Sequence, residues 1–392
     1  MLLRIDFPYW SCKIAPDMKT LDLLSRLLRT ITFTLPLLAG SLCWAGTSAD
    51  ILDETHASVR AAMALQHGIT SELLKWPDVL GTAIGLNDSG EPDLVVYVER
   101  NGAWRAGAIQ SLLLQLMYIP VRTEVTEKIV AYRGGPHPGG GSGTSHTALQ
   151  TPPIQLGTSG GWRYDLANGY CCGGTLGSLI HVNGVEYILS NYHVFESDIV
   201  NGGNNLVANT GNPVIQPGLI DVRCNASSAQ NVGTLVKLSS LPGSNVDVSV
   251  AQATSGMVRT DGAILEIGTL SSQTVGASLN QAVKKSGRTT GLSRSHISGL
   301  NATISVQYEN ECAGGTAFTK TFTGQILASN NGSGFLNSGD SGSLMVEDVS
   351  TSPHAVGLLF AGNSSIAVAN PIGEVLQFVG GKLGATASMV GN

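Results

Sequence analysis

The sequence has few basic residues and no cluster of them. Lysine and arginine make up 22 of its 392 residues, against 28 aspartates and glutamates, and the net charge is −6. Nucleic acids and anionic membrane surfaces are recognised by dense positive charge, so neither is expected as the main partner. Cys-x-x-Cys pairs and histidine pairs at ligand spacing are lacking as well, which predicts no metal and no other cofactor.

A G-x-S-x-G elbow, the turn that carries the nucleophile of α/β-hydrolases, is also missing, because Ser343 stands where its last glycine would be. The segment in question is Gly339-Asp340-Ser341-Gly342. A serine becomes a nucleophile only where it is held rigidly, given a base and placed beside N–H groups that receive the oxyanion. Flanking glycines allow such a turn, in which the N–H groups of Gly339 and Ser341 converge. Ordinary turns have the same composition, so the prediction of a nucleophile depends on whether the chain also supplies a base and a carboxylate to orient it.

His193 is the best candidate for the base among the eight histidines. It follows an alternating apolar run over 185–192, so its side chain would be fixed at the end of a rigid strand. A half-buried histidine hydrogen-bonded to the backbone would look the same in isolation.

Asp247 is the favoured third member, because a polar turn runs there into a period-two strand. Its carboxylate could be buried to orient the imidazole. Three rivals remain. Asp198 is close to His193 in sequence and belongs to the same loop, whereas Asp221 and Asp261 stand beside turn residues.

The order His193, Asp247, Ser341 is that of chymotrypsin-type proteases and differs from the order in α/β-hydrolases. From about residue 171 to 376 the chain resembles the trypsin-like serine protease superfamily, with a histidine motif at 190–194 and a serine motif at 339–342. Within it, the chain looks closest to the plant narrow-leaf type proteases and their bacterial relatives. The segments that carry this narrower resemblance are 173–177, 190–194, 212–218 and 356–362.

The resemblance implies a serine endopeptidase that works through an acyl-enzyme. Ser341 would be the nucleophile, His193 the general acid and base, Asp247 the group that orients it, and the amides of Gly339 and Ser341 the oxyanion hole. It also implies a mainly β fold, a chymotrypsin-like double β-barrel preceded by a small α+β domain. The partner would be a protein or peptide substrate; oligomeric state stays open.

Two features of the digestive relatives are missing. No cysteine stands next to His193 to pin its loop with a disulfide, and no Ile-Val-Gly-Gly type activation terminus precedes Cys171. Asp340 therefore has no new amino terminus to pair with, and the sequence names no other donor for it.

Specificity for lysine or arginine is not expected, because Phe335 stands where trypsin-like enzymes place an acidic residue. The small residues Ala361 and Gly362 end the strand that resembles the pocket wall, which predicts a medium apolar side chain. The residues predicted to bind substrate are Phe335, Phe360, Ala361 and Gly362.

Residues 1–45 are expected to lie outside the fold. Residues 18–45 show a positive region, an apolar run over 31–42 and a small-residue site ending at Ala45, which is typical of a secretory signal; residues 1–17 precede it. The apolar run is too short to span a membrane comfortably, so no span is expected after processing. A secreted or periplasmic location follows.

The cysteines agree with export. Removal of the signal leaves an even number, and adjacent Cys171 and Cys172 are expected to pair elsewhere because a vicinal bridge strains the peptide. With Cys224 and Cys312 as the other two, the partners stay open.

Three further regions follow the signal. Residues 46–133 show mixed periodicity and predict the small α+β domain, with helices over 59–74 and 109–117 and strands over 82–86, 94–98 and 121–130. Residues 134–161 are rich in glycine and proline and predict a linker in which His137 and His146 are solvated. Residues 162–392, with short apolar runs between turns and a short helix over 373–378, predict the protease domain.

Two other functions remain as alternatives. The first is a catalytically silent binding or chaperone module on the same fold. The second is a secreted β-rich adhesin or carbohydrate binder in which His193, Asp247 and Ser341 lie apart.

Overall fold

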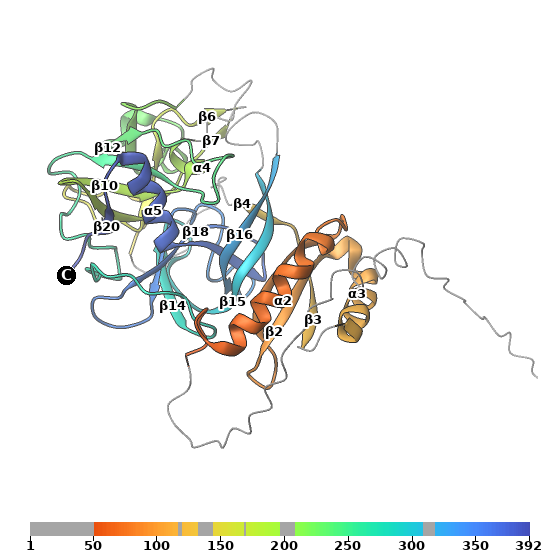
Figure 1. Ribbon diagram of the computed structural model, residues 1–392. Helices are drawn as coiled ribbons and strands as arrows, with labels where there is room; N and C mark the ends of the chain where they lie inside the picture. The colour runs from red at the N-terminus through yellow and green to blue at the C-terminus, as the bar shows by residue number, and fades with distance from the viewer. Residues whose placement is uncertain (1–50, 117–119, 132–143, 168–169, 197–207, 309–317) are drawn as a thin grey trace, which may run out of the picture. The chain divides into compact units, whose positions relative to one another are not determined.

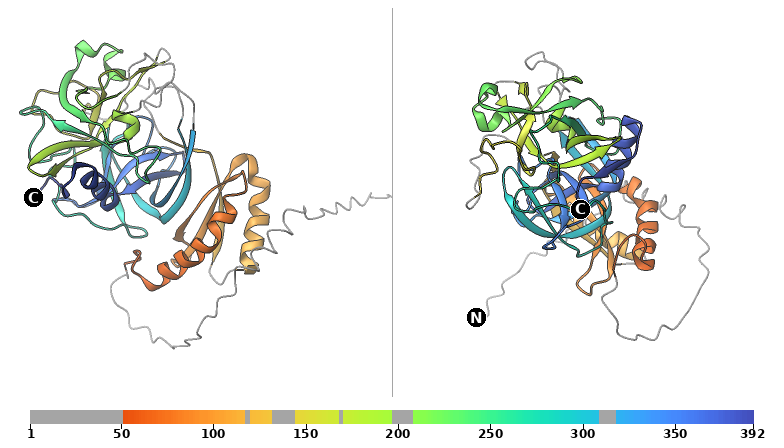
Figure 2. Two further views of the ribbon diagram at one scale, coloured as in Figure 1. Left: turned by 45° about the horizontal axis from the view of Figure 1, so that its top comes forward. Right: turned by 90° about the vertical axis from the view of Figure 1, so that its left-hand side faces the viewer.

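The computed structural model describes residues 51–116, 120–131, 144–167, 170–196, 208–308 and 318–392 (Figure 1). Strands dominate this part of the chain, and most of them belong to two large sheets. In Figure 2 the strands of one sheet are mostly yellow to green, apart from its last strand, which belongs to the blue C-terminal end of the chain. The barrel strands of the other sheet run from cyan to blue, and the two sheets lie side by side in both views.

The first sheet has the strand order β20-β9-β10-β13-β12-β11-β5-β8. Its strands are β5 (Thr158–Trp162), β8 (Gly174–Leu176), β9 (Ser178–Val182), β10 (Val185–Ser190), β11 (Pro213–Gln216), β12 (Gln230–Val236), β13 (Ser249–Ala253) and β20 (Ala387–Met389). All the strand pairs described in this sheet are antiparallel, as expected for short apolar runs separated by glycine, asparagine and serine turns.

The second sheet closes into a ring, because β14 pairs with both β17 and β15. The strands of the ring are β14 (Ala282–Gly287), β15 (Gly291–Tyr308), β16 (Phe318–Ser329), β17 (Leu344–Glu347), β18 (Ala355–Gly362) and β19 (Ile366–Pro371). From residue 300 onwards β15 alternates between buried and partly exposed residues, which is the period-two pattern of a strand with one face in a core.

The two sheets share one hydrophobic core. Leu189 of β10 and Val250 of β13 belong to the same cluster as Leu358 of β18, and all three are fully buried. The C-terminal helix α5 (Ile372–Leu383) adds Val375 to this cluster, near the place where the sequence predicts a helix. The chain therefore has the expected mainly β, chymotrypsin-like double β-barrel fold.

A small α+β part precedes the barrels. It consists of α2 (Ala57–Leu73), β1 (Val79–Leu86), β2 (Pro92–Glu99), the 3-10 turn η1 (Arg100–Gly102), α3 (Ala103–Leu116), β3 (Val121–Thr126) and β4 (Ile129–Ala131). The helices and strands expected from periodicity are confirmed, with the last predicted strand divided into β3 and β4. Strand β1 pairs antiparallel with β15, so this small sheet continues the second barrel sheet.

Short elements complete the described chain. They are β6 (Leu166–Ala167), β7 (Tyr170–Cys171), the one-turn helix α4 (Tyr192–Phe195), and the 3-10 turns η2 (Leu219–Val222) and η3 (Ala226–Ser228). Among the residues that the structure describes, none of the helices has the length and apolar character needed to cross a membrane.

Part of the expected linker is packed. Ile154 and Leu156 are fully buried members of the core, and His146, which the sequence places in solvent, is only 5% exposed. Glycine content alone therefore overstates the exposed segment, because the apolar residues after position 150 reach the barrel.

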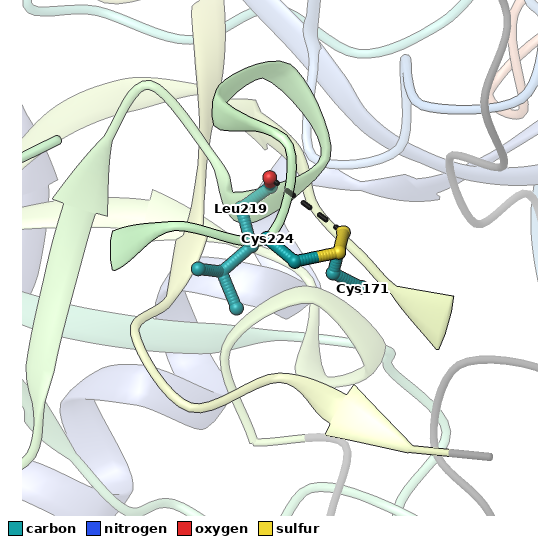
Figure 3. The surroundings of a disulfide bond; sticks show 3 residues. All are labelled: Cys171, Leu219 and Cys224. Atoms are coloured by element: carbon teal, nitrogen blue, oxygen red, sulfur yellow. Dashed lines mark hydrogen bonds between the residues drawn. A yellow bond between two sulfur atoms is a disulfide. The ribbon is translucent and has the colours of Figure 1, made fainter. Parts of the chain in front are cut away.

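A disulfide joins Cys171 to Cys224, with Cα atoms 5.4 Å apart (Figure 3). The expectation that Cys171 does not pair with its neighbour is confirmed, while Cys312 lies outside the described residues. The bridge fixes β7 beside the end of η2, where the carbonyl of Leu219 lies 3.7 Å from the Cys171 sulfur.

Replacing both Cys171 and Cys224 with serine is expected to lower the free energy of unfolding by about 2–4 kcal/mol, because the bridge closes a long loop in the unfolded chain. Urea titration of the variant and the oxidised wild type measures the difference. Equal midpoints and slopes would contradict the stabilising role.

Candidate active site

Strand pairing brings His193 and Asp247 to one end of the first sheet. Strands β10 and β13 are antiparallel, with Ser190 opposite Ser249, so the residue after β10 lies beside the residue before β13. The side-chain amide of Asn191 donates to the backbone carbonyl of Asp247 at 2.7 Å and fixes this junction. One turn of helix, α4, then turns His193 inward.

The His193 ring is held by Asp247. Its Nδ1 lies 2.6 Å from Asp247 Oδ2, and neither side chain is exposed. The phenol of Tyr308 donates to the same carboxylate oxygen at 2.8 Å, and Asn370 Oδ1 accepts from the backbone N–H of Asp247 at 2.9 Å. A carboxylate that accepts at Nδ1 places the proton of a neutral imidazole there and leaves Nε2 as an acceptor.

Nε2 of His193 is buried and has no hydrogen-bond partner among the described residues. Buried polar atoms are almost always paired, and an orphan therefore calls for a specific reason. The lone pair of Nε2 is the one that a general base would use.

The rival carboxylates are engaged elsewhere. Asp221 forms two hydrogen bonds with Arg288, at 2.6 and 2.7 Å. Asp261 pairs with Arg259 at the surface. Asp198 lies outside the described residues. Of the described candidates, Asp247 alone contacts His193.

Ser341 lies in the turn between β16 and β17. Gly339 and Gly342 on either side have φ of 94° and 92°, a conformation that favours glycine. A side chain at Gly342 would come within 2.3 Å of the hydroxyl of Ser190, the last residue of β10. Close packing against β10 therefore requires a glycine at position 342.

The hydroxyl of Ser341 donates to the carbonyl of Phe360 at 3.2 Å, and the residue is fully buried. It is not hydrogen-bonded to His193. The backbone carbonyl of Ser341 accepts from Thr175 N at 2.9 Å, which ties the serine turn to β8 of the first sheet. The serine turn is therefore fastened to the same sheet that carries His193.

The predicted oxyanion amides are free of backbone partners. Among the described residues, neither Gly339 N–H nor Ser341 N–H donates to a backbone carbonyl. Their neighbour Asp340 is fully buried and paired with Lys285 at 3.1 Å, which supplies the donor that the sequence does not name.

Strand β4 covers the edge of β18 next to Ser341. It pairs antiparallel with β18, Ala131 opposite Ala361 and Val130 opposite Gly362. It also pairs in parallel with β15, where Val306 lies opposite Ile129. Two residues predicted to bind substrate therefore pair with this chain's own segment.

The remaining predicted substrate residues are aromatic and buried. Phe360 is fully buried and packs 4.9 Å from the ring of Phe322, measured between ring centres. Phe335 is 1% exposed, and its carbonyl accepts from Ser293 at 2.9 Å.

Sequence reasoning missed Tyr308 and Lys285. Tyr308 lies 61 residues beyond Asp247, on the other sheet, and only its place at the end of an apolar alternation hinted at burial. Lysine is rarely buried, so no pattern in the sequence predicts Lys285 inside the fold.

No protein-family model matches the sequence, and neither does any curated protein. Similar solved structures include a glutamic acid specific serine protease, at 15% identity and a TM-score of 0.39, with 60% of this chain and 100% of that chain covered. Thermobifida fusca protease A matches at 20% identity and a TM-score of 0.38, over 61% and 99% of the two chains. Cellulomonas bogoriensis chymotrypsin matches at 21% identity and 0.34, over 56% and 91%. Likeness of this degree does not specify an activity.

Replacing Tyr308 with phenylalanine is expected to lower the free energy of unfolding by roughly 1.5–3 kcal/mol, because a buried carboxylate loses a donor. Urea titration measures the loss. Tyr187→Phe is the matched control, since no hydrogen bond joins the Tyr187 hydroxyl to a described residue. An unfolding midpoint for Tyr308→Phe equal to that of the control would contradict the proposed bond.

Proposed function

We propose that the chain is a secreted serine endopeptidase that hydrolyses peptide bonds through an acyl-enzyme, with Ser341, His193 and Asp247 as its triad. The observation that carries the proposal is the buried imidazole of His193, bound at Nδ1 by Asp247 and without a partner at Nε2 in the part of the chain that the structure describes. A buried ring nitrogen without a hydrogen bond lowers stability, but it can accept a proton and so serve as a general base.

In the first step the Ser341 hydroxyl leaves the Phe360 carbonyl, gives its proton to His193 Nε2 and attacks the carbonyl carbon of the substrate. The N–H groups of Gly339 and Ser341 receive the oxyanion. The peptide C–N bond then breaks, and the amine departs with the proton from His193. Water, deprotonated by the same imidazole, hydrolyses the ester, while Asp247 stays ionised and orients the ring.

The proposed location is outside the cytoplasm. The disulfide between Cys171 and Cys224 is a bond that persists in oxidising compartments. The signal-like pattern over 18–45 would supply the route of export. A small domain over 46–133 and a protease domain up to residue 392 are part of the same proposal, with the linker between them ending before Ile154, which packs in the barrel core.

The proposed preference is for a medium apolar side chain rather than lysine or arginine. Phe335 would replace the acidic base of a trypsin-like pocket, and Ala361 and Gly362 would pair with the substrate backbone. Support comes from β18, whose edge at these two residues already accepts an antiparallel strand.

That strand, β4, is proposed to act as an internal cover in the manner of a bound substrate. In this antiparallel register Ala131 lies opposite Ala361, which follows Phe360 in the sequence. The carbonyl of Phe360 accepts the hydrogen bond from the Ser341 hydroxyl. Asn363 anchors the approach by donating to Thr126 at 2.9 Å and to the Glu127 carbonyl at 2.7 Å. Substrate would compete with β4 for the same edge.

A catalytically silent binding module is the second candidate. It is favoured by the hydrogen bond from Ser341 to Phe360, which leaves the hydroxyl turned from the base. The two functions differ in whether Ser341 reacts.

A fluorophosphonate probe is expected to label the purified chain at Ser341, and Ser341→Ala is expected to abolish labelling and to lower peptide hydrolysis by about 10⁶-fold. Mass spectrometry locates the adduct, and circular dichroism checks the fold. Ser338→Ala, in the same turn, is the control and should label normally. A folded wild type without adduct would leave the silent module as the function.

Ile129→Asp is expected to raise the rate of probe labelling at least about 10-fold, because burying a carboxylate costs more than the roughly 1.4 kcal/mol that a factor of ten requires. Ile129 is 1% exposed in the cluster that contains Tyr192 and Phe360. Val125→Asp, at a position 43% exposed on β3, is the matched control. Equal labelling rates for both variants and wild type would refute the cover.

A further inference from the structure

A buried ion pair lies directly behind the serine turn. Lys285 of β14 places its ammonium 3.1 Å from Asp340 Oδ2, and both side chains are fully buried. The same ammonium donates to Thr290 and to the carbonyl of Gly291. Removing two charges from water costs several kcal/mol per ion, so a pair of this kind is retained for geometry more readily than for stability.

Asp340 joins two turns. Its Oδ1 accepts from the N–H groups of Thr289 and Thr290 at 2.8 and 3.2 Å, in the turn between β14 and β15. Its Oδ2 accepts from the Thr290 hydroxyl at 2.7 Å and from Asn337 N at 3.0 Å. Gly339 and Ser341, the residues on either side of Asp340, carry the N–H groups proposed for the oxyanion.

The backbone is shaped for this contact. A side chain at Gly287 would come within 2.7 Å of Asp340 Oδ1 and 3.2 Å of the Lys285 ammonium. A side chain at Gly339 would come within 2.6 Å of the Thr289 hydroxyl. Both glycines let the serine turn press against β14.

We propose that Lys285 is the positioning residue for the oxyanion-binding amides, which it holds in place through Asp340 without any newly formed amino terminus. The inference rests on the proposed function, because it concerns how that site is kept ready. Cleavage of the chain would then serve to remove a cover or to release a domain, and would not be needed to order the serine turn.

The groups around Lys285 determine the pH dependence. Burial lowers the pKa of the Lys285 ammonium, and the charge of Asp340 opposes that change. His146, whose pKa is also lowered by burial, reaches the cluster from the segment before β5 and contacts Ser286 and Glu266, each at 3.1 Å.

Arg288, in the turn after β14, is neutralised by Asp221. The charge that faces Asp340 is therefore the Lys285 ammonium. As the pH rises through the pKa of Lys285, that charge is lost, and Asp340 loses its counter-ion. Activity should fall on the alkaline side.

The experiment compares Lys285→Met, Lys285→Arg and Lys284→Met in the full chain, by the rate of fluorophosphonate labelling of Ser341 across pH. Lys284, the neighbour on β14, donates instead to the Val349 carbonyl, at 2.6 Å, and is the matched control. We expect Lys285→Met to slow labelling about 100-fold, the usual effect of losing an oxyanion donor. Lys284→Met should stay within about 2-fold of wild type, because Lys284 is bonded to Val349 and not to the serine turn.

Lys285→Arg should retain labelling and move the alkaline loss to higher pH, because a guanidinium keeps its proton beyond about pH 12. Should Lys285→Met not fold, the double variant Lys285→Met/Asp340→Asn removes both charges and leaves none unpaired. It is expected to fold and to label slowly.

The inference would be overturned, with the peptidase intact, if Lys285→Met or the double variant were labelled at the wild-type rate. It would likewise be overturned if Lys285→Arg and wild type lost labelling at the same alkaline pH. A wild type that is never labelled would overturn the peptidase and this inference together. A loss in Lys284→Met equal to that in Lys285→Met would also overturn it, since the effect would then belong to β14 in general.

Discussion

An ionised carboxylate sealed from water has to find its donors within the protein, and Asp247 finds them on both sheets. The His193 ring approaches from the end of β10, and the Tyr308 phenol from the end of β15. Asn370 of β19 holds the backbone N–H of Asp247. Because loss of one donor would leave a buried charge poorly compensated, the two sheets are held to one arrangement. The same contacts favour the tautomer of His193 with its proton on Nδ1, and Nε2 has no hydrogen-bond partner among the described residues.

Asp340, a second buried carboxylate, holds the serine turn in place, as Asp247 holds the imidazole of His193. Asp340 receives N–H groups from the turn between β14 and β15 and a charge from Lys285. The two carboxylates differ in their partners: one is neutralised by an ammonium on its own sheet, whereas the other relies on neutral donors across the sheets. Under the proposed function, Asp247 would position the His193 imidazole, and Asp340 would position the N–H groups of Gly339 and Ser341. Neither carboxylate would touch a substrate.

The small α+β part is continuous with the second sheet through β1 and β15, and its last strand, β4, returns to the edge of β18. Main-chain hydrogen bonds recognise any extended segment in the right register, whether it belongs to a substrate or to the same chain. Under the proposed function, β4 and a substrate would therefore pair with the same edge of β18.

The sequence by itself determined the local elements and led to the prediction of three catalytic residues. Alternation over 185–192 predicted β10, helical spacing predicted α2, and the order of His193, Asp247 and Ser341 predicted the triad, because these signals depend on neighbours along the chain. Tertiary structure alone decided which distant groups satisfy the buried charges and which strand covers the site. The sequence does not show that Lys285 is buried or that the strand with Ile129 lies between β15 and β18, since both depend on partners dozens of residues away.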